Sequence, residues 1–401
     1  MSHIVVLSSI YLGKASTNGL CAHNIVDALS EEGNEIDVIC YEDTEVCNIK
    51  NVHTIHNNPQ AYKSNIDKLV SKLSKSFYFL LSSPRCYLEE NKVDSYYKAL
   101  CKIDESFKID AIVAILFPLE TAEAMTRFKR SHPETKTIIY ELDSISDGVA
   151  QSNAIQKFLN FNYYKWLYSM YWVIDNVIIM KSHSDYWLKA FGGRFRNKLK
   201  IADIPVLLPR IKKSTNYDEV SFLYAGLIEK KYRSPEYLLQ VVSEISKRFP
   251  LVFRFYSKGD CEDMIANYAR EIPGIQQNGY VTQAELENAI DNTNFLVSIG
   301  NSTSNSVPSK LISYISYQKP IIHFSSQKND VCGDYLARYP LSLVISQDNS
   351  IEESANQIIS FIEDLKCKEF SNIPIGTMYK MNIPSYSAKL ICSIANHNPN
   401  G

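Results

Sequence analysis

Apolar residues along the chain gather into short runs, and these runs alternate with longer stretches in which apolar positions recur every three or four residues. Residues 5–9 form one such run, residues 21–32 have the helical spacing and end at Gly33, and residues 35–40 form a second run. A strand, a helix and a strand in this order make a βαβ unit. Such connections join parallel strands, so the opening residues predict a parallel sheet.

The rest of the first half repeats the pattern. We expect further strands from short runs rich in β-branched residues, at 111–116, 137–140, 176–180 and 200–206. A helix over residues 182–191 is expected to stop at Gly192 and Gly193, because glycine is a poor helix former.

The second half restarts after a polar, basic stretch. Its expected strands are residues 221–225, 251–256, 295–299 and 320–324, with a loop at 226–233 and a turn at 257–260. Its expected helices are residues 235–249, 262–271, 282–292 and 308–317. Thr282 and Glu285 have the spacing of a capping box, which marks a helix start.

Two α/β blocks of similar size predict two domains. The 401 residues exceed the about 250–300 that one hydrophobic core usually serves. We expect an N-terminal Rossmann-like domain at 1–208, a linker at 209–219 and a second Rossmann-like domain at 220–380. Residues 381–401 are expected to form a helix that packs back towards the N-domain. Ligands of doubly wound sheets bind at the carboxyl ends of the strands, which predicts a cleft between the two domains.

Two helical segments raise the question of a membrane surface. From Tyr62 to Leu81, apolar residues recur with helical spacing and four lysines occupy other positions, so this basic amphipathic helix either packs on its own domain or lies on an anionic membrane. Residues 158–172 are aromatic on most faces, which favours a helix buried between elements and leaves a membrane-facing role open. The 26 Tyr of the chain fit ring-lined surfaces or a compositional bias.

Charge and composition exclude several classes of protein. Lys and Arg number 42 against 44 Asp and Glu, and a protein whose main partner is nucleic acid needs a basic surplus. The nine cysteines form no CxxC pair and the eight histidines no zinc-binding spacing, which favours reduced thiols, a cytoplasmic location, no metal and no cofactor. We find no secretory leader pattern and no apolar stretch of about 20 residues.

Five short motifs follow one another along the chain. They begin at Asn18-Gly19, Tyr140-Glu141-Leu142-Asp143, Phe222-Leu-Tyr-Ala-Gly226, Arg233-Ser234-Pro235 and Ser306-Val-Pro308-Ser309-Lys310-Leu311. The last continues through Ser313 to Gln318-Lys319-Pro320. Together they resemble the GT-B nucleotide-sugar glycosyltransferases, in particular the retaining, family-4-like group that builds bacterial surface polysaccharides. The resemblance implies two Rossmann-like domains that face a central cleft, with the domain at 1–208 on the acceptor side and the domain at 220–380 binding the nucleotide sugar.

The resemblance also assigns roles at the donor phosphates. Lys310, in the first turn of a helix that opens on Pro308, would place a cation where the helix dipole already favours an anion, and Ser309 would donate a hydroxyl. Arg233 would supply a second, forked cation to the leaving diphosphate, so that no metal is needed. Two surface cations beside helix starts are the alternative.

The remaining candidates contact other parts of the substrates. Gly19 would let a loop approach the phosphates, Gly226 would offer backbone contacts to phosphate, and the turn at Tyr280 and Val281 would contact the base. Asp143 would bind the transferred sugar or orient the acceptor hydroxyl. Ordinary turn residues, and a helix N-cap at Asp143, are the alternatives.

Several positions depart from the family's pattern. The carboxylates that usually flank the donor helix are replaced by Asn305 and Ser313, so a ribose hydroxyl would meet only a serine. Leu227 stands where an arginine often follows the glycine, and Leu142 replaces a histidine. The fold does not depend on these positions, whereas the donor and the stereochemical outcome do.

We therefore expect a metal-independent hexosyltransferase, peripheral on the inner face of the membrane. It would move a hexose from a nucleotide diphosphate sugar, first of all UDP, to a lipid-linked or oligosaccharide acceptor in polysaccharide synthesis, with retention implied by the resemblance. One alternative is a catalytically degenerate GT-B subunit that binds a glycan or a partner. Another is a GT-B nucleotide-sugar epimerase.

Overall fold

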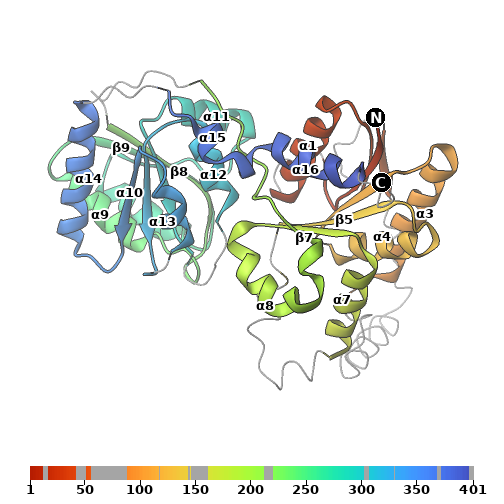
Figure 1. The fold of residues 1–401 in the computed structure, drawn as a ribbon. Helices are drawn as coiled ribbons and strands as arrows, with labels where there is room; N and C mark the ends of the chain where they lie inside the picture. The colour runs from red at the N-terminus through yellow and green to blue at the C-terminus, as the bar shows by residue number, and fades with distance from the viewer. Residues whose placement is uncertain are drawn as a thin grey trace, which may run out of the picture. The chain divides into compact units, whose positions relative to one another are not determined.

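The computed structural model divides into two compact units, each with its own parallel sheet (Figure 1). Unit 1 comprises Met1–Val206 with Met381–Gly401, and unit 2 comprises Leu207–Lys380. The structure describes residues 1–11, 17–41, 51–55, 88–116, 118–142, 145, 161–211, 220–301, 307–328, 330–367 and 372–396. Asp143, Asn305, most of the expected linker and the helix expected from Tyr62 to Leu81 lie outside the described residues.

Unit 1 is built on a seven-stranded sheet in the order β3-β2-β1-β4-β5-β6-β7, and all of its strand pairs are parallel. The strands are β1 His3–Leu7, β2 Glu35–Tyr41, β3 Val52–Ile55, β4 Ala111–Ile115, β5 Lys136–Glu141, β6 Asn176–Ile179 and β7 Leu199–Ile201. Every residue of β1 and β4 is buried, as expected for central strands covered by helices on both faces.

Helices cover both faces of this sheet. They are α1 Thr17–Glu31, α3 Glu90–Ser106, α4 Leu119–Ser131, α7 Phe161–Val173, α8 Ser184–Phe195 and α16 Pro384–Ala395, with 3₁₀ turns η2 Lys181–His183 and η3 Arg196–Lys198. The strand order reverses direction at β1, and right-handed connections therefore place α1 opposite α4, α7 and α8, as Figure 1 shows. The C-terminal helix α16 packs on α1.

Helix α8 corrects one prediction, because it continues through Gly192 and Gly193 to Phe195. Each glycine costs a helix about 1 kcal/mol. Phe191 and Phe195, only 2% exposed each, fill the core under this helix, and burying a phenylalanine yields about 1.5–3 kcal/mol. Core burial therefore outweighs the local preference of the two glycines.

Unit 2 holds a six-stranded parallel sheet in the order β10-β9-β8-β11-β12-β13. The strands are β8 Val220–Ile228, β9 Leu251–Gly259, β10 Ile275–Gln277, β11 Phe295–Ile299, β12 Ile321–Ser325 and β13 Ser342–Ser346. The reversal at β8 puts the ends of β8 and β11 side by side, and ligands of doubly wound sheets bind at such a point.

The helices of unit 2 follow the expected alternation. They are α9 Glu236–Ser246, α10 Glu262–Glu271, α11 Gln283–Asp291, α12 Ser309–Ser316, α13 Val331–Leu336, α14 Ile351–Lys366 and α15 Ile375–Met378, with the 3₁₀ turn η4 Lys380–Asn382 at the junction with unit 1. The predicted capping box is present: the Thr282 side chain accepts from the Glu285 amide, and the Glu285 side chain accepts from the Thr282 amide.

Strands β8 and β9 run further than expected. Residues 226–228 and 257–259, which we predicted as a loop and a turn, pair in register as strand. The extension requires glycine, because Gly259 has a φ of +147° and a Cβ there would lie 1.7 Å from the Ile228 carbonyl oxygen. Among the described residues, no helix is both long and apolar enough to cross a membrane.

Candidate functional site

The best-defined polar site lies in unit 2, where Arg233 follows β8 and Asn301 follows β11. The Asn301 Oδ1 atom accepts from Nε of Arg233 at 3.0 Å and from Nη2 at 2.6 Å. The Nη1 atom points to the Leu227 carbonyl at 3.4 Å. Arg233 is half-buried, and these acceptor oxygens are neutral, so they do not offset the positive charge of the guanidinium.

Asn301 is fixed from a third loop. Gln327, which follows β12, donates from Nε2 to the Asn301 carbonyl at 2.8 Å. The preceding Gly300 has no room for a side chain, because a Cβ would lie 2.8 Å from Oδ2 of Asp330 and 3.4 Å from Nε2 of His323. Loops after three neighbouring strands therefore position the arginine.

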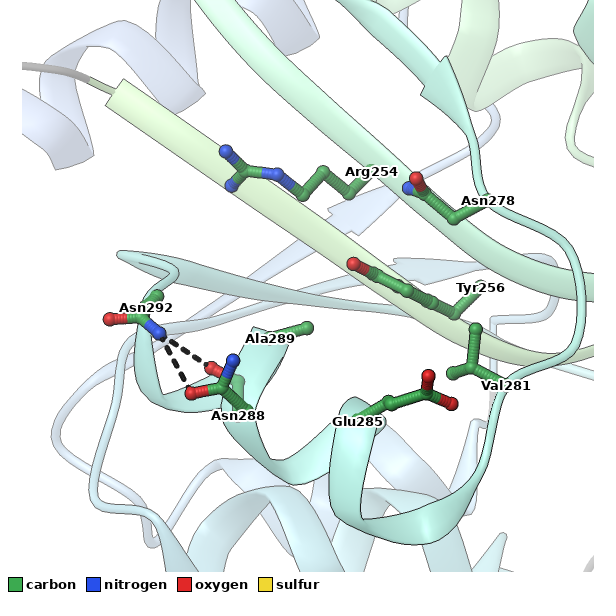
Figure 2. A pocket seen from close by; sticks show the side chains of 8 residues that line it. All are labelled: Arg254, Tyr256, Asn278, Val281, Glu285, Asn288, Ala289 and Asn292. Atoms are coloured by element: carbon green, nitrogen blue, oxygen red, sulfur yellow. Dashed lines mark hydrogen bonds between the residues drawn. The ribbon is translucent and has the colours of Figure 1, made fainter.

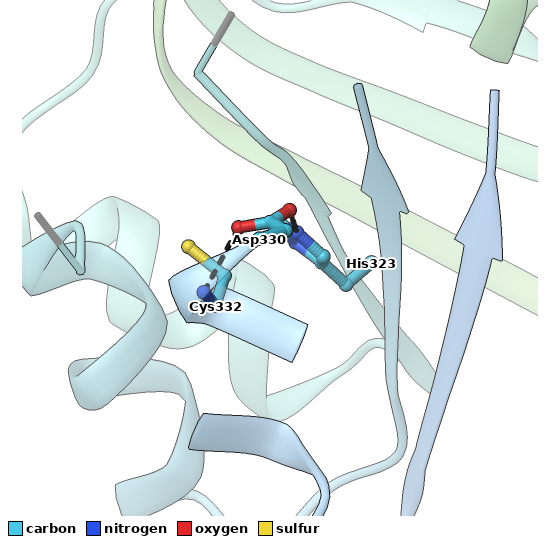
Figure 3. A group of neighbouring side chains, drawn as sticks. All are labelled: His323, Asp330 and Cys332. Carbon is cyan, nitrogen blue, oxygen red and sulfur yellow. Dashed lines mark hydrogen bonds and ion pairs between the residues drawn. The ribbon is translucent and has the colours of Figure 1, made fainter. Parts of the chain in front are cut away.

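His323 and Cys332, both buried, and the half-buried Asp330 form a group beside Gly300 (Figure 3). His323 Nε2 lies 2.7 Å from Asp330 Oδ2, and the Cys332 amide donates to Asp330 Oδ1 at 2.9 Å. Burial favours protonation of Asp330, but the His323 hydrogen bond and charge outweigh it and hold the pKa of Asp330 below its usual value. Asp330 thereby caps α13 and anchors the loop that carries Gln327.

The same three side chains have metal-ligating atoms within 4.8 Å of one another. Burial and the neighbouring Asp330 raise the pKa of the Cys332 thiol, so that the sulfur keeps its proton. The hydrogen bonds given above join His323 and the Cys332 amide to Asp330.

Helix α12 is joined to β8 by Tyr314, and Tyr224 makes a hydrogen bond within β8. The buried Tyr314 hydroxyl accepts from the Ala225 amide at 2.9 Å, and Tyr224 donates to the Leu227 carbonyl at 3.0 Å. Burial raises the pKa of Tyr224, and the charge and hydrogen bonding of Arg233 oppose that rise. The predicted donor helix is therefore joined to the strand that precedes Arg233.

Lys310 and Ser309 open α12, as the sequence predicts. Lys310 is half-buried and has no hydrogen bond or ion pair with any residue that the structure describes; burial lowers its pKa, against a smaller opposing effect of Glu287. An unpaired, partly desolvated ammonium at a helix start is suited to an anion. Ser313 lies one turn on and donates to the Ser309 carbonyl at 3.1 Å.

The two residues of the turn predicted to contact the base, Tyr280 and Val281, have different surroundings. Tyr280 is 73% exposed, whereas Val281 lines a pocket of about 440 Å³ between β9 and α11. Figure 2 shows Arg254 and Tyr256 on one side of this pocket and the α11 residue Asn288, with Asn292 just after that helix, on the other. The pocket is polar, in keeping with the amides and the hydroxyl that line it.

Gly226 ends up inside β8 with a φ of +146°, a conformation that L side chains rarely adopt. In unit 1, Gly19 is buried in the first turn of α1, which begins at Thr17, and thus does not belong to the expected loop. Leu142 is buried after β5, and Asp143 lies outside the described residues.

Sequence reasoning missed three residues. Asn301 and Tyr314 act through contacts with residues far away in the chain, although a polar residue directly after strand β11 was a usable signal. Glu141, at the end of β5, is fully buried and accepts from the Tyr171 hydroxyl at 2.6 Å. Its place inside a quoted motif was the only signal in the sequence.

In chemical terms, unit 2 offers an oriented arginine, a lysine at a helix start that pairs with none of the described residues, and positive-φ backbone at the carboxyl end of its sheet. Such groups can bind phosphate oxygens and stabilise charge on a leaving phosphate.

The sequence matches no protein-family model and no curated protein. Solved structures do match over nearly the whole chain. A point mutant of S. aureus TarM, in complex with fondaparinux, alpha-GlcNAc-glycerol and UDP, has a TM-score of 0.60 at 12% identity, covering 99% of this chain and 100% of its own. WaaG, a glycosyltransferase involved in lipopolysaccharide biosynthesis, has a TM-score of 0.54 at 10% identity, covering 99% and 100%.

UDP-GlcNAc 2-epimerase from Methanocaldococcus jannaschii has a TM-score of 0.57 at 10% identity, covering 98% of this chain and 100% of its own. At such identities the similarity is one of fold. Two Rossmann-like α/β units, matched end to end by these proteins, give this chain the GT-B fold.

Proposed function

We propose that this chain is a glycosyltransferase that moves a hexose from a nucleotide diphosphate sugar, UDP being the first candidate, to a lipid-linked or oligosaccharide acceptor in polysaccharide synthesis. The observation that carries the proposal is Arg233, which Asn301 holds without neutralising its charge. The UDP named with TarM and the lipopolysaccharide biosynthesis named with WaaG support the substrate classes.

The residues of unit 2 divide the work on the donor. Arg233 and Lys310 bind the diphosphate, and as the bond from the sugar to the diphosphate breaks, the two cations stabilise the charge that collects on the leaving oxygens. Their two positive charges take the place of a metal ion, so we propose a metal-independent transfer without a cofactor. Retention follows the resemblance: the acceptor hydroxyl attacks the sugar from the face that the diphosphate leaves, and its proton passes to an oxygen of the leaving diphosphate.

The remaining assignments extend this reaction. Ser309, Ser313 and Gly226 contact the phosphates and ribose, while Tyr280 and Val281 contact the base; Gly19 and Asp143 of unit 1 serve the phosphates and the sugar or acceptor. We place the protein in the cytoplasm, peripheral on the inner membrane face, where a lipid-linked acceptor is available.

The direct test offers the full-length protein UDP-, GDP- and dTDP-sugars and measures thermal stabilisation, then release of the nucleotide diphosphate with lipid-linked oligosaccharide present. One nucleotide class is expected to stabilise the protein, and release is expected to continue in EDTA. No stabilisation by any nucleotide, and no release with or without acceptor, would contradict the proposal.

An epimerase is a second candidate, because the M. jannaschii UDP-GlcNAc 2-epimerase shares the fold over its full length. Conversion of free UDP-GlcNAc into its epimer without acceptor, followed by NMR, would favour it. The degenerate subunit, motivated by Ser313 and Leu227, is favoured instead if Lys310→Ala and Arg233→Ala leave polymer assembly intact.

A further inference from the structure

Helix α7 presents large aromatic side chains to solvent. Phe161 is 62% exposed and Trp172 is 68% exposed, and with Lys165 and Ser169 they form the outer stripe of the helix at spacings of three and four residues. Tyr168 is half-buried beside this stripe. The opposite face, with Trp166, Leu167, Met170 and Tyr171, is buried in the core. We expected a helix buried between elements and left a membrane-facing role open; α7 is buried on one face and exposes Phe161 and Trp172 on the other.

Helix α8 adds positive charge next to that stripe. The Tyr168 hydroxyl donates to the Ala190 carbonyl of α8 at 2.9 Å, and Tyr168 and Arg194 line one groove between the two helices. Figure 1 shows α7 and α8 adjacent on one side of unit 1. The outer side of α8 and the turn after it carry exposed Lys189, Arg194 and Arg196.

The charge of this region is opposite in sign to that of the whole chain. Residues 161–200, all of which the structure describes, contain seven Lys and Arg and two Asp, whereas the chain has a net charge of −2. Of the two acids, Asp175 is paired with Lys129 at 2.8 Å, which leaves Asp185 as the exposed carboxylate of the segment. The exposed aromatic rings of α7 therefore lie in a part of the chain with a net positive charge.

We propose that the outer face of α7 and α8 binds the surface of an anionic phospholipid bilayer. Trp and Phe side chains are stable at the level of the lipid headgroups, where the ring leaves water, and Lys and Arg are attracted by the lipid phosphates. Since α7 is anchored by its buried face, it lies along the surface and does not insert. The inference rests on the proposed function only for its purpose, which is to bring the enzyme to a lipid-linked acceptor.

This face is distinct from the basic helix expected from Tyr62 to Leu81. It needs no donor, acceptor or catalysis to be tested, so its failure and the failure of the glycosyltransferase proposal are separate results. Charge complementarity favours a lipid surface over a folded protein partner, since flexible, exposed cations without matching hydrogen-bond geometry suit diffuse phosphate charge.

The tryptophans provide a direct readout. Trp166 and Trp187 are 9% and 0% exposed, so Trp172 is the indole whose surroundings change when this face meets lipid. The full-length protein is mixed with vesicles of phosphatidylcholine, or of phosphatidylcholine and phosphatidylglycerol. A blue shift of the emission with the phosphatidylglycerol vesicles, absent with phosphatidylcholine alone and absent in Trp172→Phe, is expected. An unchanged spectrum in bound wild-type protein would overturn the proposal.

Co-sedimentation with the same vesicles tests the charges. Lys165→Gln, Lys189→Gln and Arg196→Gln together are expected to weaken binding by about tenfold or more, because each cation near an anionic surface contributes separately. Lys247→Gln, Lys258→Gln and Lys366→Gln on unit 2 change the net charge equally and should bind as the wild type does. Equal loss in both triple variants, no loss in either, or no vesicle binding by the wild type would overturn the proposal.

Discussion

Asn301 accepts two hydrogen bonds from Arg233, at 3.0 Å from Nε and 2.6 Å from Nη2, across 68 residues of sequence. An aspartate in the same place would orient the guanidinium equally well but would cancel its charge. The neutral amide oxygen orients the arginine and leaves the charge available to a ligand. The role of Arg233 in the proposed function depends on this pair.

Arg233→Lys should lower kcat by about 100-fold, because a lysine cannot donate both to Asn301 and, as a fork, to a phosphate. The measurement is release of the nucleotide diphosphate under saturating donor. Arg248→Lys, the same exchange at an exposed position of unit 2, is the matched control and should keep wild-type kcat. A fully active Arg233→Lys variant would remove Arg233 from the mechanism.

Two substitutions at Asn301 separate orientation from charge. Asn301→Ala frees the guanidinium and should reduce kcat about tenfold with a smaller effect on donor affinity. Asn301→Asp keeps Arg233 in place but pairs it with a carboxylate, so donor affinity should fall by about tenfold or more. Calorimetry with UDP gives the affinity, and the release assay gives kcat. The same change in both parameters for both variants would contradict a positioning role.

Lys310→Met should stabilise the free protein and weaken donor binding. Burial lowers the pKa of Lys310, so the unfolded chain binds this proton more tightly than the folded one, and the charged lysine destabilises the fold at neutral pH. The Tm of Lys310→Met should therefore exceed that of wild type at pH 7. The gap should close as pH rises through the lowered folded pKa towards 10.5. A lower Tm with intact UDP binding would show that Lys310 is structural.

Gly300→Ala should disturb the site without reaching it directly. The new Cβ would lie 2.8 Å from Oδ2 of Asp330 and 3.4 Å from Nε2 of His323, the two atoms that share a hydrogen bond. We expect a loss of about 1–3 kcal/mol in stability, measured by urea unfolding, and a decrease in kcat because Asn301 shifts. Gly333→Ala, where a Cβ meets only Val344 Cγ1 at 3.8 Å, is the control. Equal effects at both positions would refute the close approach at Gly300.

Asp37 links His3 and His53 in unit 1, at 2.7 Å and 2.6 Å. Burial alone would lower the pKa of His3 and raise that of Asp37, but their hydrogen bond reverses both: the pKa of His3 is raised and that of Asp37 is held well below 3.8. The contribution of His3 to the free energy of unfolding is complete below pH 6.5, and it is lost as the pH rises through the raised pKa of His3. The contribution of Asp37 to the free energy of unfolding is complete above pH 3.8, and it is lost as the pH falls through the lowered pKa of Asp37.

Asp37→Asn should consequently lower Tm most between pH 3.8 and 6.5, by about 3 °C or more, with a smaller difference at pH 8. Thermal unfolding across this pH range measures the difference. A constant difference at every pH would show that the His3 imidazole does not respond to Asp37.

Local features of the sequence predicted a helix boundary correctly where interactions between neighbouring residues determine it. The capping box at Thr282 and Glu285 is complete within four residues, and α11 begins there as expected. At Gly192 and Gly193 the local rule failed, because the rings of Phe191 and Phe195 are buried by residues distant in sequence. Pattern reasoning could not weigh that burial against the cost of glycine.

The candidate site was predictable only in part. Lys310 and Ser309 follow from a local motif, and they lie at the start of α12 as expected. The hydrogen bonds that orient Arg233 join loops after separate strands, and no spacing in the sequence encodes them. Trp172 shows the same limit on the surface, since an aromatic run alone does not tell which rings are buried.

The central claim is that unit 2 binds a nucleotide diphosphate through Arg233 and Lys310. Titration calorimetry of UDP, and of GDP and dTDP as alternatives, into the full-length wild type and the Arg233→Lys, Lys310→Met double variant tests it most directly. We predict binding of one nucleotide by the wild type, weakened about 100-fold or more in the double variant and unchanged in Arg248→Lys. Absence of binding in the wild type, or equal affinity in the double variant, would contradict the claim.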